Sequence, residues 1–216
     1  MSAISDVTIF NMALDLIDEE PISSTEFENP TGLAGQLAQR HFAQRRRVTL
    51  RKHPWNFATR RTLLPALTEA IPFGDYDNWY DLPADFIRVA TIGEWGEYFK
   101  GEYRIEDNRI LIRGVDAILS NGTLPLRYVY DFTNFPKADA LFIECLTYEI
   151  AIAIVKKLTG SSSERERLRT ELADIAPEAY SIDGQDSPPS RINRSKLLEA
   201  RRGMRSSRAR SDRVYF

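Results

Sequence analysis

The stretch ADALFIECLTYEIAIAIVKKL, residues 138–158, decides how this chain folds. A helix over these residues is apolar on more than one face, and such a helix belongs at the centre of a bundle or between subunits. Five charged side chains interrupt the stretch and would be costly in the middle of a bilayer, so we expect no membrane span. The apolar positions are Leu141, Phe142, Cys145, Leu146, Ile150, Ile152, Ala153 and Ile154.

Two helices are predicted before this central one. The first begins after Ser5, which suits an N-cap, and ends before the acidic run and proline of residues 18–21, because proline cannot continue a helix. After a loop, Asn29 as cap and Pro30 at the first helical position predict the start of the second helix. That helix is expected to end near His53, since the residue that follows is proline.

The middle of the chain changes to β-strand patterns. Residues 86–92 and 126–130 are β-branched or aromatic runs with partial alternation. Between them, a hairpin is predicted in which Tyr103 and Ile105 face Ile110 and Ile112 across a polar turn containing Asp107 and Asn108. This part is therefore expected to form one small, mostly antiparallel sheet.

A last helix and a basic arm follow the central helix. Residues 161–164 have the spacing of a capping box, and the apolar seam of this helix stops at Pro177. Residues 186–216 hold nine Lys or Arg and three acids, a net charge of +6, which leaves residues 1–185 with 20 basic and 28 acidic side chains, net −8. A basic arm on an acidic body commonly reaches for a negatively charged surface outside its own fold.

The sequence thus predicts an α+β protein in three parts. Residues 1–57 and 138–180 form an antiparallel helical bundle, and residues 58–137 form an inserted, small, mostly antiparallel β-sheet domain. Residues 181–216 form a linker and an extended, basic C-terminal arm.

Catalytic and metal-binding chemistry is not indicated. Cys145 is the only cysteine and suits a small core residue, while His41 and His53 are the only histidines. Common nucleophile, zinc-protease and phosphate-loop motifs are missing, and the acids at residues 75–81 lack the pattern of a calcium loop. We therefore expect no enzyme, no cofactor and no metal. The start of the chain lacks the pattern of a secretory signal, so synthesis in a cytoplasm is expected.

The second helix carries a run of basic side chains, which has three readings. Such a run is usually a solvated face or a source of intersubunit ion pairs, and nucleic-acid contact is the third reading. Consecutive arginines point around most of a helical turn, which favours several partners over one groove. The candidates for intersubunit charges are Arg40, Arg45, Arg46, Arg47 and Arg51.

Two sequence blocks carry a resemblance to a known family. They are HPWNFA at residues 53–58 and YDLPADFIRV at residues 80–89, and they accompany ALDLI at residues 13–17 and EPI at residues 20–22. With these blocks the chain resembles the tail tubular protein A family, the head-to-tail adaptors of short-tailed bacteriophages, over roughly residues 5–180.

The resemblance implies a structural virion protein at the portal–tail junction. Members form a twelve-membered ring beneath the portal protein and above the tail nozzle protein, and genomic DNA passes through the ring. The two blocks are then scaffold: a helix break, large apolar anchors and a fixed turn. The scaffold residues are His53, Pro54, Trp55, Asn56, Phe57, Leu82, Pro83 and Asp85.

The arm is expected to dock on the portal, because ring adaptors must grip it. Arginines would pair with portal carboxylates, and apolar side chains would fill a groove. The docking residues are Arg191, Arg194, Lys196, Leu197, Leu198, Arg201, Arg202, Arg205, Arg208, Arg210, Arg213, Tyr215 and Phe216. The alternative is a nucleic-acid-binding protein whose Arg-rich arm neutralises phosphates.

Overall fold

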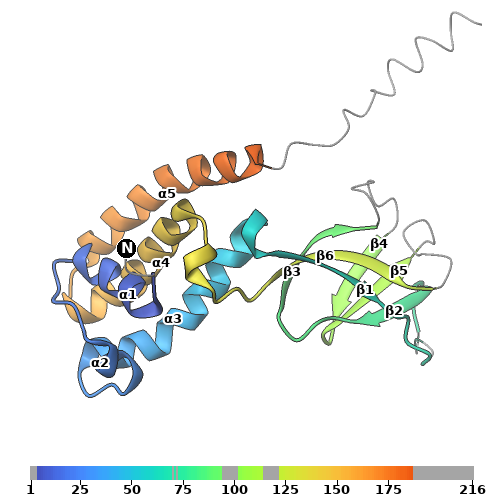
Figure 1. Ribbon diagram of the computed structural model, residues 1–216, viewed down its shortest axis with the longest axis horizontal. Coiled ribbons are helices and arrows are strands. Elements are labelled where there is room, and N and C mark those ends of the chain that lie inside the picture. The colour runs from blue at the N-terminus through green and yellow to red at the C-terminus, as the bar shows by residue number, and fades with distance from the viewer. Residues whose placement is uncertain (1–3, 70, 72, 94–101, 114–121, 187–216) are drawn as a thin grey trace, which may run out of the picture.

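The computed structural model describes residues 4–69, 71, 73–93, 102–113 and 122–186, and it has a helical part and a β-sheet part side by side (Figure 1). The chain enters the β part once and returns, so helices from both ends of the described sequence lie together. The predicted α+β class is confirmed. The predicted arm lies outside the described residues, except for its first ones.

Helix α4 (Ala140–Leu158) lies at the centre of the helical part, as the sequence predicts. It packs against α1 (Asp6–Asp15), α3 (Leu33–Lys52) and α5 (Ser162–Gln185). Side chains on several of its faces are buried, among them Phe142, Leu146, Ile150 and Ile154, each fully. The buried thiol of Cys145 belongs to the same core, which confirms its expected place.

Several predicted helix ends are confirmed by their capping contacts. The Ser5 hydroxyl accepts a hydrogen bond from the Thr8 backbone N–H at the start of α1. The Ser161 hydroxyl does the same for Glu164 at the start of α5. Helix α3 ends at Lys52, with extended backbone at His53.

The predicted start of the second helix is wrong. Helix α3 begins after Gly32, not after Asn29, and the preceding loop contains a short helix, α2 (Ser24–Glu28). The Glu26 carboxylate accepts hydrogen bonds from the backbone N–H groups of Thr31 and Gly32, so a neighbouring helix supplies the cap that local sequence does not. Hydrogen bonds from the Thr31 hydroxyl and these amides hold the pKa of Glu26 below its ordinary value.

The predicted end of the last helix at Pro177 is also wrong. Helix α5 continues through this proline to Gln185, so residues 181–185, predicted as linker, are helical. A proline inside a helix costs about 3 kcal/mol, because it removes a hydrogen bond and crowds the preceding turn. Beyond it, Ala179 and Asp183 are buried against the rest of the protein, and these contacts offset that cost.

Among the described residues, the β part contains two three-stranded antiparallel sheets, where one sheet was expected. The first has the order β1-β6-β3 and the second the order β2-β5-β4. The strands are β1 (Thr59–Leu64), β2 (Asn78–Asp81), β3 (Phe86–Ile92), β4 (Glu102–Glu106), β5 (Arg109–Arg113) and β6 (Leu124–Tyr130). Buried side chains of both sheets form one cluster, which is separate from the helical core.

The predicted hairpin is confirmed with its register. Strands β4 and β5 place Tyr103 opposite Ile112 and Ile105 opposite Ile110. Asp107 and Asn108 make the turn with φ values of 45° and 57°. Two successive residues with positive φ are typical of the tight hairpin turn whose twist matches that of the strands.

Candidate functional site

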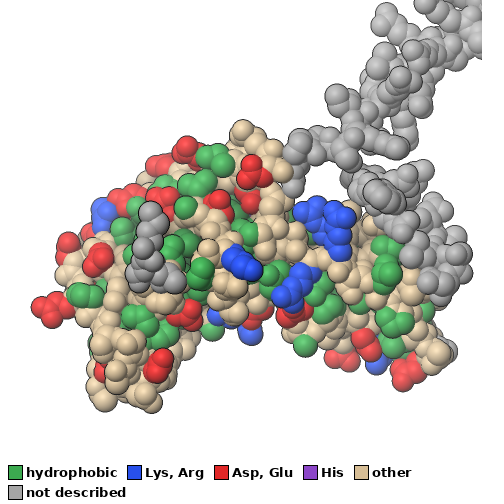
Figure 2. Space-filling view, in the orientation of Figure 1, with side chains coloured by type: hydrophobic (Ala, Val, Ile, Leu, Met, Phe, Trp, Pro, Cys, Tyr) green, Lys and Arg blue, Asp and Glu red, His purple; other side chains and the backbone are tan. Residues whose placement is uncertain are grey.

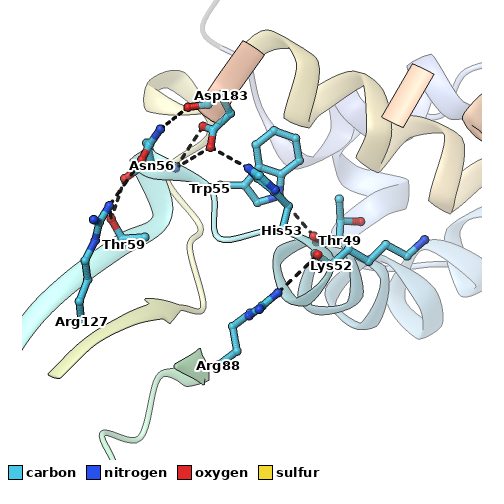
Figure 3. Close-up of polar contacts among 9 residues, drawn as sticks. All are labelled: Thr49, Lys52, His53, Trp55, Asn56, Thr59, Arg88, Arg127 and Asp183. Atoms are coloured by element: carbon cyan, nitrogen blue, oxygen red, sulfur yellow. Dashed lines mark hydrogen bonds and ion pairs between the residues drawn. The ribbon is translucent and has the colours of Figure 1, made fainter. Parts of the chain in front are cut away.

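The block at residues 53–58 forms the corner at which the helical part becomes the β part (Figure 3). Helix α3 ends before His53, a short turn covers Asn56–Ala58, and β1 begins at the next residue. Trp55 is fully buried at this corner, and its indole N–H donates to the Thr49 carbonyl oxygen at 3.3 Å. The block is therefore a joint between the two parts, with Trp55 at its buried centre.

Asp183, near the end of α5, ties that helix to the corner. Its carboxylate lies 2.8 Å from His53 Nε2 and accepts a hydrogen bond from the Asn56 backbone N–H at 3.1 Å. The Asn56 side-chain amide in turn donates to the Asp183 backbone oxygen at 2.5 Å. The side chain of Asp183 is only 7% exposed. The sequence analysis missed this residue, because it lies in a stretch that was predicted to be a linker.

Aromatic packing closes the same corner. The His53 ring stacks on Tyr180 of α5, with ring centroids 4.7 Å apart and planes 7° from parallel. Trp55 meets Phe142 of α4 edge-on at 5.3 Å and Tyr180 at 5.6 Å. Phe57 also packs against Phe142, at 5.0 Å. One set of rings thus holds the corner between α3 and β1 against α4 and α5.

Arginines bridge the two parts by binding backbone and amide oxygens. Arg51 of α3 donates to the Ile87 carbonyl oxygen in β3 at 2.6 Å, and Arg88 of β3 donates back to the Arg51 carbonyl oxygen at 2.9 Å. Arg127 of β6 lies 3.4 Å from the Asn56 side-chain oxygen. Arg51, expected to pair between subunits, therefore binds within its own chain.

The second block, residues 80–89, connects the two sheets. Leu82 is buried and donates its backbone N–H to the Asn108 carbonyl oxygen of the β4–β5 turn. The Phe86 backbone N–H donates to the Pro83 carbonyl oxygen, which confirms the predicted fixed turn before β3. The Asp85 carboxylate accepts from the Tyr128 hydroxyl at 3.0 Å and pairs with Arg60 at 2.6 Å. Burial first, and then this carboxylate, raises the pKa of Tyr128.

The arginine run of α3 pairs with carboxylates of the same chain. Arg46, which is 8% exposed, binds Asp131 through two nitrogens at 3.0 and 2.9 Å. Arg47 binds the other oxygen of Asp131 at 2.8 Å.

Arg45 and Lys52, also on α3, both pair with the buried Glu149 of α4. Most of the run therefore pairs within its own chain, but Arg47 and Lys52 stay exposed, and the reading as a solvated face is wrong only for the buried Arg46. Arg40 alone of the five candidates for intersubunit charges has no hydrogen bond or ion pair with any described residue, so for Arg40 an intersubunit role stays a prediction.

Reactive groups are shielded in the described part of the protein. Burial raises the pKa of the Cys145 thiol to about 11. Burial and then Arg45 lower the pKa of His41. Within the described residues, no group of three or more His, Cys, Asp or Glu could hold a metal ion, and no helix is long and apolar enough to cross a membrane. The candidate docking residues between Arg191 and Phe216 lie outside the described residues.

Comparison with known proteins adds no relative. No protein-family model matches this sequence, and no curated protein matches it significantly. The function must therefore be argued from the residues and their arrangement.

Proposed function

We propose that this chain is a structural virion protein, a head-to-tail adaptor that assembles into a ring between the portal and the tail nozzle of a short-tailed bacteriophage. The main observation behind the proposal is that the two sequence blocks that resemble the tail tubular protein A family both connect parts of the fold. Both blocks serve as joints: residues 53–58 join helices to sheets, and residues 80–89 join one sheet to the other. Joints of this kind suit a subunit that must keep its shape under load.

The charge distribution supports the same proposal. Residues 1–185 carry a net charge of −8, so a ring built from them attracts DNA weakly and lets it slide through. The basic residues after Asp186 then dock on carboxylates of the portal. The contacts of Asp183 hold the end of α5, after which the basic residues follow in the sequence, at the corner.

Electron microscopy of the full-length chain tests the proposal directly. The purified protein is imaged alone and after mixing with portal rings encoded by the same genome. Rings, alone or stacked coaxially on the portal, are expected. Single subunits that neither assemble nor join the portal would reject the adaptor function.

A truncated chain tests the docking role of the arm. Deleting residues 187–216 leaves α5 and the residue after it intact, so the circular dichroism spectrum of the described fold should persist. Portal attachment is expected to disappear. If the truncated chain still binds portal rings, the arm is not the docking element.

A nucleic-acid-binding function is the second candidate, and the +6 charge of residues 186–216 favours it. Fluorescence anisotropy with a duplex of about 30 base pairs distinguishes it, because each phosphate contact contributes about −0.9 to the slope of log K against log salt. A slope of roughly −5 or steeper favours this candidate, whereas no binding at about 50 mM salt excludes it.

A further inference from the structure

One face of the sheet β1-β6-β3 carries arginines that have no carboxylate partner among the described residues. Arg61 of β1 and Arg127 of β6 are directly opposite each other, and Arg88 of β3 projects from the same face one pair closer to the helices. Like charges opposite one another across strands are destabilising. Arg61 has no hydrogen bond or ion pair with any described residue, while Arg127 and Arg88 bind neutral oxygens. We call Arg61, Arg127 and Arg88 the arginine face.

Most other arginines of the described chain are paired, which makes the arginine face distinctive. Acidic side chains form ion pairs with arginines on α3, with Arg60 of β1, with arginines of the second sheet and with arginines in the first half of α5. Figure 2 shows Lys and Arg side chains grouped where the helical part meets the sheets. The arginine face therefore has positive charge that the described fold does not compensate.

The second half of α5 has the opposite imbalance. Residues 170–186 contain five acids and no Lys or Arg, and the last turn of α5 has no basic residue. Asp174 and Glu178 are exposed and have no hydrogen bond or ion pair with the described residues, and Ile182 follows on the same side. We call Asp174, Glu178 and Ile182 the acidic row.

The spacings of the two surfaces agree. Side chains four residues apart on a helix are about 6 Å apart, and side chains directly opposite across antiparallel strands are about 5 Å apart. Asp174 and Glu178 can thus meet Arg61 and Arg127 at the same time.

Each surface also has one large aliphatic side chain beside its charges. Leu63, two residues after Arg61 on the same face of β1, is 57% exposed, and Ile182 is 41% exposed. Charged pairs around an apolar contact are typical of a protein interface.

We infer that the arginine face docks onto the acidic row of a second copy of this chain. Guanidinium groups of Arg61 and Arg127 bind the carboxylates of Asp174 and Glu178, and Leu63 packs near Ile182. The docking surface and the receiving surface are different parts of the chain, so repeated docking can generate a ring. This inference rests on the self-assembly proposed above and names the surfaces that perform it.

Two charge-reversed variants of the full-length chain test the docking. One variant carries Arg61→Glu and Arg127→Glu, and the other carries Asp174→Arg and Glu178→Arg. Sedimentation velocity at about 50 mM salt, where surface charges are weakly screened, measures their assembly. Each variant alone is expected to associate at least about 100-fold more weakly than the wild type, because like charges meet at the interface.

Mixing the two variants provides the decisive measurement. In the mixture, every reversed surface finds an opposite charge on the other variant, so assemblies of wild-type mass should reappear. Circular dichroism spectra and melting temperatures of both variants show that each is folded. Two double variants serve as matched controls, Arg104→Glu with Arg113→Glu and Asp15→Arg with Glu28→Arg. They change the charge by the same amounts at other places and should assemble as the wild type does.

The outcomes separate this inference from the adaptor proposal. If both variants assemble as the wild type does, or if the mixture stays unassembled, the docking inference is overturned. The ring proposal is not affected by either result. A wild-type chain that is monomeric at about 500 µM overturns self-docking, since an interface of standard size binds far more tightly. In that case, loss of duplex DNA binding in the first variant alone would assign the arginine face to phosphates.

Discussion

Replacing Asp183 with alanine is predicted to destabilise the protein by about 3 kcal/mol. The carboxylate accepts a hydrogen bond from the Asn56 backbone N–H at 3.1 Å and lies 2.8 Å from His53 Nε2. Its removal leaves two part-buried donors without an acceptor, and each such loss costs about 1–3 kcal/mol. We take the lower half of that range for each, because both donors keep some access to water.

Urea unfolding followed by far-ultraviolet circular dichroism and by tryptophan fluorescence measures the effect. The thermal midpoint should fall by about 6–12 °C, since a chain of this size loses about 2–4 °C per kcal/mol. The control Asp186→Ala removes an exposed acid three residues later and should change stability by less than about 0.5 kcal/mol. An Asp183→Ala variant as stable as this control would refute the role of Asp183 as the tie between α5 and the corner.

Three further predictions concern the fold around this corner and beyond it. Asp131→Ala leaves the buried Arg46 without its carboxylate and should cost about 3–5 kcal/mol in urea unfolding. Gly35→Ala should cost about 1–3 kcal/mol in the same assay, because the new Cβ would lie 2.6 Å from the Glu26 carbonyl oxygen. With a pKa of about 11, the Cys145 thiol stays protonated below that pH, so it should not react with a thiol reagent at about pH 8 until the protein is denatured.

The first two of these predictions have a control variant, and the third has an outcome that would contradict it. Arg47→Ala removes the more exposed partner of Asp131 and should cost less than about 1 kcal/mol. Gly184→Ala places its Cβ in open space and should be nearly neutral, so equal losses at both glycines would contradict the steric argument. Rapid labelling of Cys145 in the folded protein would show that α4 is not the buried centre of the helical part.

Local patterns predict much of this fold because their causes are local. Ser5 and Ser161 cap helices through residues three positions away, and Asp107 and Asn108 fix the hairpin register by their own backbone geometry. Pro177 misled the prediction, since its local cost is outweighed by contacts that α5 makes with distant residues. The division of the strands into two sheets also depends on long-range pairing, which no single strand reveals.

The candidate docking surfaces likewise depend on long-range pairing, which local sequence patterns do not predict. Consecutive arginines in α3 attract notice in the sequence, yet Asp131 and Glu149, each more than 80 residues away, neutralise most of them. Arg61 follows the same basic run and Arg127 stands alone in the sequence, but strand pairing brings the two together, and neither has a carboxylate partner among the described residues. The charges that remain for a partner are thus decided by the tertiary fold. For that reason the mixing of oppositely reversed variants tests a surface that the sequence alone does not display.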